Sequence, residues 1–345
     1  MTSKRINIAL QGGGAHGAFT WGVLDRLLDD ERIEIAAISG TSAGAINGAA
    51  YKAGWMKNGR EGAREELDWL WSEIGRLDAL GFPEWMNAWL PDPGIVSLGL
   101  SYSPAFLFGD SLARATSPYA WGPLYDNPLR PIVERFEYEH VCSVDGPQLF
   151  VCATSVRDGK VRVFSRDKLT TGALMASACL PTLFQAVEEP CPNTGEIEAF
   201  WDGGYSANPA LFPLYQQDLP DDIVVVNINP LHRDAVPITA QEIQNRINEI
   251  SFNSALLRDL RAVNFVQRLI ATGAVGEGQM KNVLVHMIAD DELMNRLSVA
   301  TKLTPIPSVI LQLKKAGRAA AETFLDQHFD DLNVSQTVDL VRMFG

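Results

Sequence analysis

The chain has few cysteines, no long apolar run and no dense cluster of basic residues, and each of these features excludes a class of protein. Its four cysteines show neither C-x-x-C spacing nor a histidine partner at zinc-site spacing. We therefore expect free thiols rather than a disulfide framework, and no metal site. No segment approaches the roughly 20 apolar residues of a membrane-spanning helix. The apolar run at 6–10 is too short for a secretory signal, so the sequence predicts a cytoplasmic protein.

The charge balance argues against several kinds of partner. With 29 basic and 42 acidic residues, the formal net charge is −13, which favours solubility. Nucleic acid is excluded as the main partner, because binding phosphates needs a basic stripe that this chain lacks. An electrostatic anchor on anionic lipid is disfavoured for the same reason, so transient contact with a membrane surface would have to be apolar. No oligomeric state is predicted.

Two short apolar runs near the N-terminus each lead into glycines. Residues 6–10 stop before Gly12 and residues 35–39 stop before Gly40, and a helical pattern of apolar or small residues follows each run. Alternation of strand and helix with short joints predicts a parallel sheet covered by helices. The near-continuous Val and Ile run at 223–229 is typical of a central strand in such a sheet. The predicted fold class is therefore α/β.

Patterns along the rest of the chain predict further elements. Strands are expected at 148–155, 161–164 and 282–288, and helices at 128–136, 172–178, 241–270 and 309–329. Neither an internal repeat nor a low-complexity linker separates them. We therefore expect a single domain over residues 1–345, with a mainly helical part at 231–345.

Residues 81–125 interrupt this alternation with six prolines among several glycines. A stretch of this length without regular structure in a compact protein is usually a functional loop or a lid, and we expect an inserted lid-like loop here. Its aromatic residues include Phe82, Trp85, Trp89, Phe106 and Phe108. Part of this set must belong to the core, but tryptophans also suit a membrane–water interface. The hypothesis is that Trp85 and Trp89 contact a lipid surface.

Gly12, Gly13 and Gly14 follow the first predicted strand, and Gly17 comes shortly after them. Through Gly12, Gly14 and Gly17 the loop satisfies the G-x-G-x-x-G pattern of dinucleotide-binding proteins, which is weak evidence by itself. Glycine-rich backbone at the start of a helix directs free N–H groups at negative charge, whether a phosphate or an oxyanion formed during a reaction. A simple tight turn would need only one or two of these glycines.

A second glycine pattern indicates a nucleophile. Ser42 lies between Gly40 and Gly44, after a predicted strand and before a predicted helix, which is the context of a nucleophile elbow. The alternative role for this serine is a helix N-cap. An exposed serine nucleophile also needs a base. None of the five histidines has a context that marks it as the base of a triad, and those at 140, 232, 286 and 328 are interpreted as surface or core residues.

An acidic residue is the candidate base. Asp202 precedes Gly203 and Gly204, and glycines beside a catalytic carboxylate allow a serine or a substrate to come near it. An Asp-Gly pair is otherwise a common turn signal. The position therefore becomes informative only together with the two patterns above.

The three patterns together resemble the patatin-like phospholipase family, which also includes the catalytic domains of cytosolic phospholipases A. The resemblance covers roughly residues 5–230 and includes Ala-Ser-Ala-Cys-Leu-Pro at 176–181 and Asn-Ile-Asn-Pro at 227–230. It implies a three-layer α/β/α fold with a mostly parallel central sheet. It also implies a Ser–Asp dyad formed by Ser42 and Asp202, and neither a metal nor an organic cofactor.

The resemblance further implies an oxyanion hole, formed by the backbone of Gly12, Gly13 and Gly14 together with the N–H of Ala43. At position 16 the family usually has Arg or Lys, whereas this chain has a histidine, whose charge can vary near neutral pH. Three roles for His16 stay open: orienting the loop, contacting a lipid phosphate, or packing.

The predicted function is a serine acyl-ester hydrolase acting on lipids, of the phospholipase A, lysophospholipase or carboxylesterase type. An acyltransferase or a thioesterase would use the same acyl-enzyme and stays an alternative. A nicotinamide-nucleotide oxidoreductase would explain the glycine loop but neither Ser42 nor Asp202. A catalytically silent lipid-binding protein need not retain both residues.

Overall fold

The computed structural model of the chain describes residues 3–77, 92–124, 126–276 and 278–344. Its central sheet consists of β1 (Lys4–Leu10), β2 (Ile33–Thr41), β3 (Gln148–Ser155), β4 (Val161–Ser165), β5 (Val187–Pro190), β6 (Ile197–Asp202), β7 (Asp222–Asn227) and β8 (Leu284–Ala289). The order across the sheet is β5-β6-β3-β2-β1-β7-β8, and β4 also pairs with β3. Neighbours from β3 to β8 in this order are parallel, whereas β4, β5 and β6 add antiparallel pairs.

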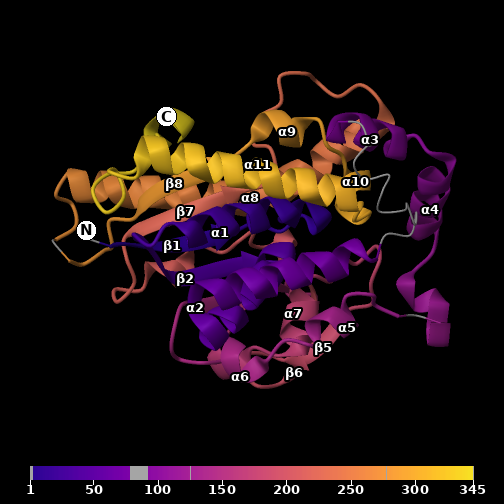
Figure 1. Cartoon of the computed structure of the whole chain (residues 1–345), viewed down its shortest axis with the longest axis horizontal. Coiled ribbons are helices and arrows are strands. Elements are labelled where there is room, and N and C mark those ends of the chain that lie inside the picture. The colour runs from indigo at the N-terminus through magenta and orange to yellow at the C-terminus, as the bar shows by residue number, and fades with distance from the viewer. Residues whose placement is uncertain (1–2, 78–91, 125, 277, 345) are drawn as a thin grey trace.

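Helices pack on both faces of this sheet, which gives three layers (Figure 1). The helices of the described ranges are α1 (Gly17–Asp29), α2 (Ala43–Gly75), α3 (Pro93–Ser101), α4 (Pro104–Ala115), α5 (Arg130–Val133), α6 (Tyr138–Val141), α7 (Thr171–Ser177), α8 (Ala240–Ala271), α9 (Asp291–Asn295), α10 (Val299–Leu303), α11 (Pro307–His328) and α12 (Leu340–Phe344). The prediction of an α/β fold with a mostly parallel central sheet between helical layers is confirmed.

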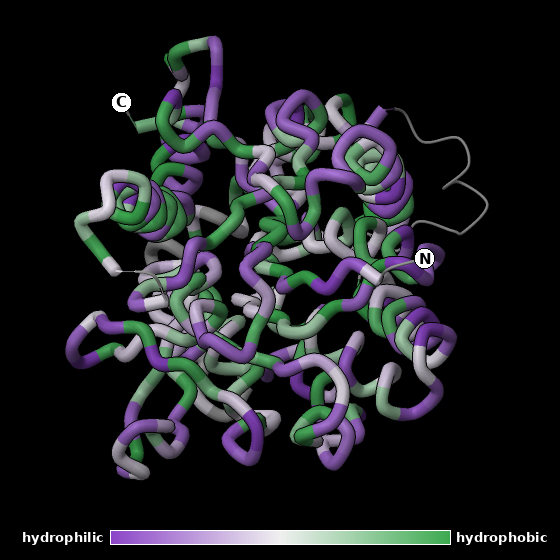
Figure 2. Tube along the Cα trace, turned by 90° about the vertical axis from the view of Figure 1, so that its left-hand side faces the viewer, coloured by the Kyte–Doolittle hydropathy of each residue, from purple (hydrophilic) through white to green (hydrophobic). Residues whose placement is uncertain are grey.

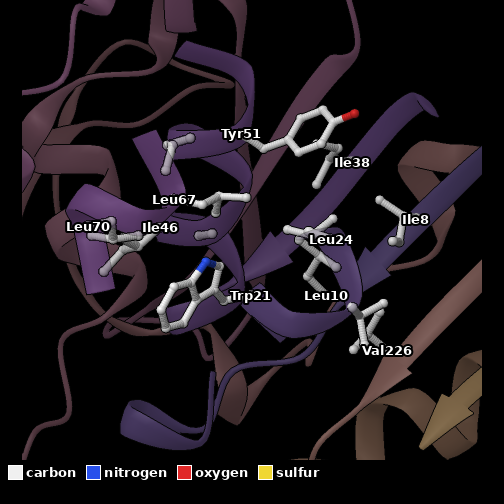
Figure 3. Packing of buried hydrophobic residues seen from close by; sticks show 14 of the residues in the cluster. Ile8, Leu10, Trp21, Leu24, Ile38, Ile46, Tyr51, Leu67, Leu70 and Val226 are labelled. Atoms are coloured by element: carbon white, nitrogen blue, oxygen red, sulfur yellow. The ribbon is translucent and has the colours of Figure 1, made fainter. Parts of the chain in front are cut away.

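Strand β1 contributes to the two larger hydrophobic cores of the described residues. Ile8 and Leu10 pack with α1, α2, α7 and α11, whereas Ala9 belongs to a second core formed with α8 and α12. This follows because successive side chains of a strand point to opposite faces of the sheet. Figure 3 labels members of the larger core from β1, β2, β7, α1 and α2. Helices seen end-on in Figure 2 carry hydrophobic and hydrophilic residues around the same turns, as two-faced helices do.

Helices α1 and α11 approach each other through glycines. A Cβ atom on Gly22 would lie 2.0 Å from the carbonyl oxygen of Lys314, and one on Gly317 would lie 2.0 Å from that of Phe19. The two helices therefore touch backbone to backbone, and Figure 1 shows α11 lying along α1. Because α10 directly precedes α11 in the chain, this contact also fixes α10 near the start of α1.

Most predicted strands and helices lie within a few residues of their expected bounds, but α2 differs. The helix expected after the second apolar run begins at Ala43 and continues to Gly75 across a kink at Asn58 and Gly59, where Gly59 has a φ of 56°. A Cβ on Gly54 would lie 2.1 Å from the carbonyl oxygen of Gly62, so the two halves of α2 meet at these glycines. The helix expected at 128–136 is a single turn, α5, and strands β5 and β6 were not predicted.

The prediction that 81–125 lacks regular structure is wrong for the part that the structure describes. Helix α3 begins at Pro93, and the Asp92 carboxylate accepts a hydrogen bond from the N–H of Gly94 at 2.8 Å. Helix α4 begins at Pro104 with Ser103 as its N-cap. Proline is tolerated in the first turn of a helix, where its missing N–H is not needed. These prolines therefore start helices.

The aromatic residues of this segment divide into two groups. Phe82, Trp85 and Trp89 lie outside the described residues, so the predicted lipid contact of the tryptophans stays a prediction. Phe106 is partly buried and lines a cavity, whereas Phe108 is 71% exposed.

The chain after residue 230 belongs to the same sheet. Strand β8 pairs with β7 in parallel, and α8 covers one face of the sheet. This part is mainly helical, as expected. The single domain expected over 1–345 stays a prediction. No helix in the described ranges is both long and apolar enough to span a membrane.

Candidate active site

Ser42 occupies a sharp turn between β2 and α2. Its φ of 53° and ψ of −124° are rare for a residue other than glycine. Such strain is typical of a nucleophile elbow, which presents the serine at the carboxyl end of a strand. The Ser42 N–H donates to Ser177 Oγ at 2.9 Å, and that hydroxyl donates to the carbonyl oxygen of Cys152 at 2.6 Å. The turn is therefore held by α7 and β3, and the Ser42 side chain makes no capping hydrogen bond to α2.

The glycines around Ser42 allow backbone segments to touch. A Cβ on Gly40 would lie 2.6 Å from the carbonyl oxygen of Gly44, and one on Gly44 would lie 2.2 Å from that of Leu10. A Cβ on Gly17 would lie 2.7 Å from the Cβ of Ala43. All three positions therefore exclude side chains, which explains why the sequence motif contains them.

Asp202 is the last residue of β6 and is completely buried. Its N–H donates to the carbonyl oxygen of Cys179 at 2.7 Å, and its own carbonyl oxygen accepts from Thr154 Oγ1 at 2.8 Å. One carboxylate oxygen, Oδ1, accepts from the N–H of Gly204 at 2.8 Å. The other, Oδ2, has no hydrogen-bond partner in the described part of the chain. It is therefore the atom free to accept a proton.

Gly203 and Gly204 fit tightly behind this carboxylate. A Cβ on Gly203 would lie 2.2 Å from the carbonyl oxygen of Cys152, and one on Gly204 would lie 2.4 Å from a ring carbon of Phe252. Side chains at either position would push Asp202 out of place. Both glycines thus allow β6 and the turn after it to pack closely against β3 and α8.

Burial raises the pKa of Asp202 to about 7, although the N–H of Gly204 and the hydroxyl of Ser42 act in the opposite direction. The Ser42 hydroxyl is close enough to exert this effect without completing a regular hydrogen bond, which is common for catalytic pairs in unliganded enzymes. A base with a pKa near neutral is far better matched to a serine than an exposed aspartate with a pKa near ~3.9. Burial therefore makes Asp202 basic enough to accept a proton from a serine at neutral pH.

Backbone donors next to Ser42 come from two segments. The N–H groups of Gly13 and Gly14 have no hydrogen-bond partner among the described residues, and both glycines line a cavity with Ser42. The N–H of Ala43, in the first turn of α2, has no partner within that helix, and Ala43 lines a neighbouring cavity. Gly14 has a φ of 57°, and a Cβ there would lie 2.2 Å from the carbonyl oxygen of Lys302.

Gly12 differs from its neighbours. Its N–H donates to Asn208 Oδ1 at 2.6 Å, so the prediction that it supplies a donor to the oxyanion hole is wrong for this geometry. A Cβ on Gly12 would lie 2.7 Å from the Cβ of Ser42, which gives this glycine a steric role.

Buried amides hold the glycine loop. Gln11 Oε1 accepts from the N–H of Ile228 at 2.9 Å and from the N–H of Asn229 at 3.1 Å. The Nδ2 of Asn229 donates to the carbonyl oxygen of Gly12 at 2.9 Å. Gln11 Nε2 donates to Asn253 Oδ1 at 3.1 Å, which links the loop to α8. These amides were not predicted as site residues, although the sequence analysis noted the Asn-Ile-Asn-Pro segment.

His16 packs beneath the loop. It lies in the 3₁₀ helix η1 (Gly14–His16), is buried, and its Nε2 is 2.9 Å from Thr301 Oγ1 of α10. Burial lowers the pKa of His16 well below its usual value, and the nearby Lys302 ammonium lowers it further. His16 is therefore neutral at neutral pH and lines neither cavity. Of its three open roles, packing and loop orientation fit this geometry.

The other four histidines lie away from Ser42, and none of them lines the two cavities described below. His286 is buried with its Nε2 3.0 Å from Asp222 Oδ1, at the start of β7. Because β2 and β7 point the same way, the start of β7 is at the opposite edge of the sheet from Ser42. His140, His232 and His328 have acidic neighbours two or three residues away.

Two cavities meet at Ser42. The larger, of about 440 Å³, includes Asp202 and Gly13 and also polar side chains of α8. The smaller, of about 240 Å³, has a mainly apolar wall that includes Ile46, Trp71 and Phe184. Residues shared by both cavities are Gly14, Ser42, Leu180, Leu183, Lys302 and Leu303. A substrate with two unlike halves could therefore lie across Ser42.

Further residues of the candidate site, which were not predicted from the sequence, come from distant segments. Ser177 lies in the recognised 176–181 segment but carried no assigned role, whereas Thr301 and Lys302 had no signal at all. Only folding brings α10 against η1. Within the described residues, no group of three or more His, Cys, Asp or Glu side chains is placed to hold a metal ion.

Comparison with known families agrees with this geometry. The patatin-like phospholipase family matches residues 8–215, which is more than half of the chain and includes both Ser42 and Asp202. The chain belongs to the patatin-like phospholipase family. It is therefore related to lipid acyl hydrolases at the level of the family. No curated protein matches the sequence.

Solved structures of similar shape include VipD from Legionella pneumophila, at 15% identity and a TM-score of 0.43 over 94% of this chain and 67% of that chain. The type III effector protein ExoU is 16% identical with a TM-score of 0.37, over 94% of this chain and 54% of that chain. The chain thus spans about two thirds of VipD and about half of ExoU. At these TM-scores the likeness adds nothing to the argument about activity.

Proposed function

We propose that this protein is a serine acyl-ester hydrolase acting on lipids, with Ser42 as nucleophile and Asp202 as its base. The observation that carries the proposal is the strained Ser42 turn, which shares one cavity with the buried Asp202 carboxylate and with Gly13 and Gly14. Ser42 Oγ attacks the ester carbonyl carbon while Asp202 Oδ2 accepts its proton. The oxyanion is held by the N–H groups of Gly13, Gly14 and Ala43, and one such donor is typically worth ~10²–10³ in rate.

The second half of the reaction uses the same groups. The protonated Asp202 returns its proton to the leaving alcohol, and the acyl group stays on Ser42 as an ester. Asp202 then takes a proton from water, whose oxygen attacks the carbonyl carbon of the acyl-enzyme. As the bond between this carbon and Ser42 Oγ breaks, Asp202 returns the proton to Oγ, and a carboxylic acid is released. Acyl transfer would differ only in the acceptor, so release of free fatty acid must be measured directly.

The test is labelling with a fluorophosphonate and mapping of the labelled serine, followed by assays of p-nitrophenyl esters and phospholipids. We expect label on Ser42 and none in Ser42→Ala, whose activity falls at least about 10³-fold, as for nucleophiles of serine hydrolases. Ser254→Ala, on the exposed side of α8, is the matched control and keeps both. Label on another serine, or activity of Ser42→Ala within tenfold of the unchanged protein, would overturn the assignment.

We also propose that the rim of the larger cavity contacts a lipid surface. Phe106 of α4 and Gln244 and Asn248 of α8 line this cavity, and large apolar side chains nearby on the same helices face solvent. They are Leu107, Phe108 and Leu112 on α4, and Ile243, Ile247 and Ile250 on α8. Exposed apolar patches of this kind commonly mark contact surfaces. A hydrolase of water-insoluble esters needs such a surface around its cavity.

A further inference from the structure

Lys302 lies beside Ser42 although it is far from it in the sequence. It belongs to α10, outside the residues that match the family, and lines both cavities. The carbonyl oxygen of Lys302 would lie 2.2 Å from a Cβ on Gly14, so the α10 backbone packs directly on the glycine loop. Figure 1 shows α10 at the same end of the molecule as α3 and α4. Among the described residues lining the two cavities, Lys302 is the one basic side chain.

The Lys302 ammonium is held by a neutral group. Its Nζ donates to Asn229 Oδ1 at 2.7 Å, and Asn229 Nδ2 in turn donates to the carbonyl oxygen of Gly12 at 2.9 Å. The second bond fixes the orientation of the amide, so its oxygen faces Lys302. An ammonium has three donors, and Asn229 is its one hydrogen-bond acceptor within the described ranges. Two donors thus remain available to a ligand.

Within the described ranges, no carboxylate forms an ion pair with this ammonium. Glu249 is the acidic group whose field reaches Lys302, but Arg233 Nε donates to its Oε2 at 2.8 Å and Arg246 Nη1 at 3.2 Å. Asp202 does not pair with Lys302 either, since its Oδ1 accepts from the N–H of Gly204 and its Oδ2 has no partner among the described residues. A partly buried cation without a counter-ion gains free energy when an anion binds beside it.

The two cavities indicate which part of a substrate brings the anion. The smaller cavity is walled by apolar groups and suits an acyl chain, whereas the larger adds the amides of Asn229, Gln244 and Asn248. The leaving alcohol of an ester attacked by Ser42 would therefore enter the larger cavity, where polar groups of α8 and Asn229 accompany Lys302.

We propose that Lys302, oriented by Asn229, forms an anion subsite in the Ser42 cleft that binds a phosphate carried by the leaving alcohol of the substrate. The proposal rests on the proposed function, because it assigns the leaving group of that reaction to the larger cavity. It makes Lys302 a specificity residue: esters with a phosphate near the scissile bond are preferred over neutral esters with the same acyl chain.

The test compares two soluble esters, 1-hexanoylglycerol 3-phosphate and 1-hexanoylglycerol. For the unchanged protein we expect a higher kcat/KM with the phosphate ester. In Lys302→Met the ratio of the two kcat/KM values falls about tenfold or more, through a higher KM for the phosphate ester, as expected for loss of a charge-assisted hydrogen bond. Lys302→Arg keeps part of the preference. Lys315→Met, an equal charge change at an exposed position of α11, is the control and keeps the ratio.

A binding measurement tests the subsite without turnover. Calorimetry with glycerol 3-phosphate and with inorganic phosphate shows whether the anion must be attached to glycerol. We expect the unchanged protein and Lys315→Met to bind glycerol 3-phosphate more tightly than inorganic phosphate, and Lys302→Met to bind neither. If Lys302→Met is poorly folded by circular dichroism, Lys302→Gln replaces it.

Three results would overturn the proposal: no preference for the phosphate ester in the unchanged protein, equal loss on both esters in Lys302→Met, or equal phosphate binding with and without the lysine. Equal loss on both esters would instead give Lys302 a part in holding the oxyanion. Failure of the proposed function looks different, because Ser42→Ala would then keep its activity and its label whatever Lys302 does.

Discussion

Residues 8–215 and the chain after residue 230 contribute different kinds of groups to the cleft around Ser42. Residues 8–215, which match the family, supply Ser42, Asp202 and the backbone donors of the glycine loop. The chain after residue 230 supplies much of the wall of the larger cavity: Gln244, Asn248, Phe252, Val299, Lys302 and Leu303. The first part carries the proposed nucleophile and base, and the second adds Gln244, Asn248 and Lys302 to the cavity wall around them.

Residues that react and residues that select a substrate are expected to be distributed differently along a sequence. A nucleophile elbow needs an adjacent strand, turn and helix, so its residues lie close together in the sequence. A cavity wall needs only that side chains meet in space, and any helix docked on the sheet edge can provide them. We therefore expect the reaction type to follow from residues 8–215 and the substrate preference to depend on α8 and α10.

The largest expected effect tests whether the first part alone supplies the base. Asp202→Asn keeps the shape of the side chain but cannot accept the Ser42 proton, so kcat should fall at least about 10³-fold on any ester. His232→Gln, at an exposed position, should leave kcat unchanged. Steady-state kinetics on p-nitrophenyl butyrate measures both. A histidine variant as damaging as Asp202→Asn would mean that the base is part of a triad.

The pH profile separates the two parts. Asp202 must be ionised to act, so kcat/KM for a neutral ester should rise with pH through about 7 and then stay level. Lys302 must be protonated to bind phosphate; burial and Arg233 lower its pKa to about 8, against the opposing effect of Glu249. For a phosphate ester, kcat/KM should therefore fall again above about 8. This second limb should disappear in Lys302→Met, and a falling limb for the neutral ester would contradict the assignment.

The same division explains what sequence reasoning could find. Ser42 stands in a local pattern whose geometry follows from backbone sterics, so it could be named as a candidate from the sequence. Asp202, Gly13 and Gly14 became candidates only because the three patterns together resemble the family. The strands at 148–155 and 223–229 were equally clear from apolar runs. Lys302 could not be found, because its place beside Gly14 depends on the α1–α11 packing and on no local pattern.

The failures at 81–125 and at Gly12 have other physical causes. A proline disrupts the interior of a helix but is favourable in the first turn. Pro93 and Pro104 could therefore indicate either a loop or the start of a helix, and only the N-caps Asp92 and Ser103 before them distinguish the two. Gly12 looked like its neighbours in the loop. Its N–H is used by Asn208, a residue almost 200 positions away, which no local pattern reveals.

A smaller effect is expected where the two parts touch. Thr301→Val removes the partner of the buried His16 Nε2 and a hydrogen bond to the carbonyl oxygen of Ser298, which should cost about 1–3 kcal/mol of unfolding free energy. Urea denaturation measures this loss. In a double-mutant cycle with His16→Leu, the double variant should lose less unfolding free energy than the sum of the losses in the two single variants. Strict additivity would show that the contact does not couple α10 to the glycine loop.

The smallest expected effect concerns the proposed lipid-contact surface at the rim of the larger cavity, to which both parts of the chain would contribute. Phe108 of α4 is 71% exposed and Ile247 of α8 is 53% exposed, so replacing either with serine should hardly change stability. Each loses apolar area that would leave water at a bilayer, so binding to phosphatidylcholine vesicles should weaken several-fold per substitution. Because the contact is apolar, 0.5 M salt (roughly a 4 Å screening length) should not weaken it.

The control for this prediction is Val334→Ser, which removes a side chain of similar exposure (70%). Val334 follows Asn333, which bonds to Asp222 at the start of β7, so it lies at the end of the sheet opposite to Ser42. Vesicle sedimentation should show weaker binding for Phe108→Ser and Ile247→Ser but not for the control. The ratio of turnover on long-chain vesicles to turnover on a soluble hexanoyl ester should fall in parallel. If only Phe108→Ser weakens binding, the surface belongs to the inserted helices alone, and α8 serves the cavity and not the membrane. If all three variants bind vesicles with the same affinity, the rim is not the lipid contact. The loss of exposed apolar area at the cavity entrance would then have no effect on the affinity for a bilayer.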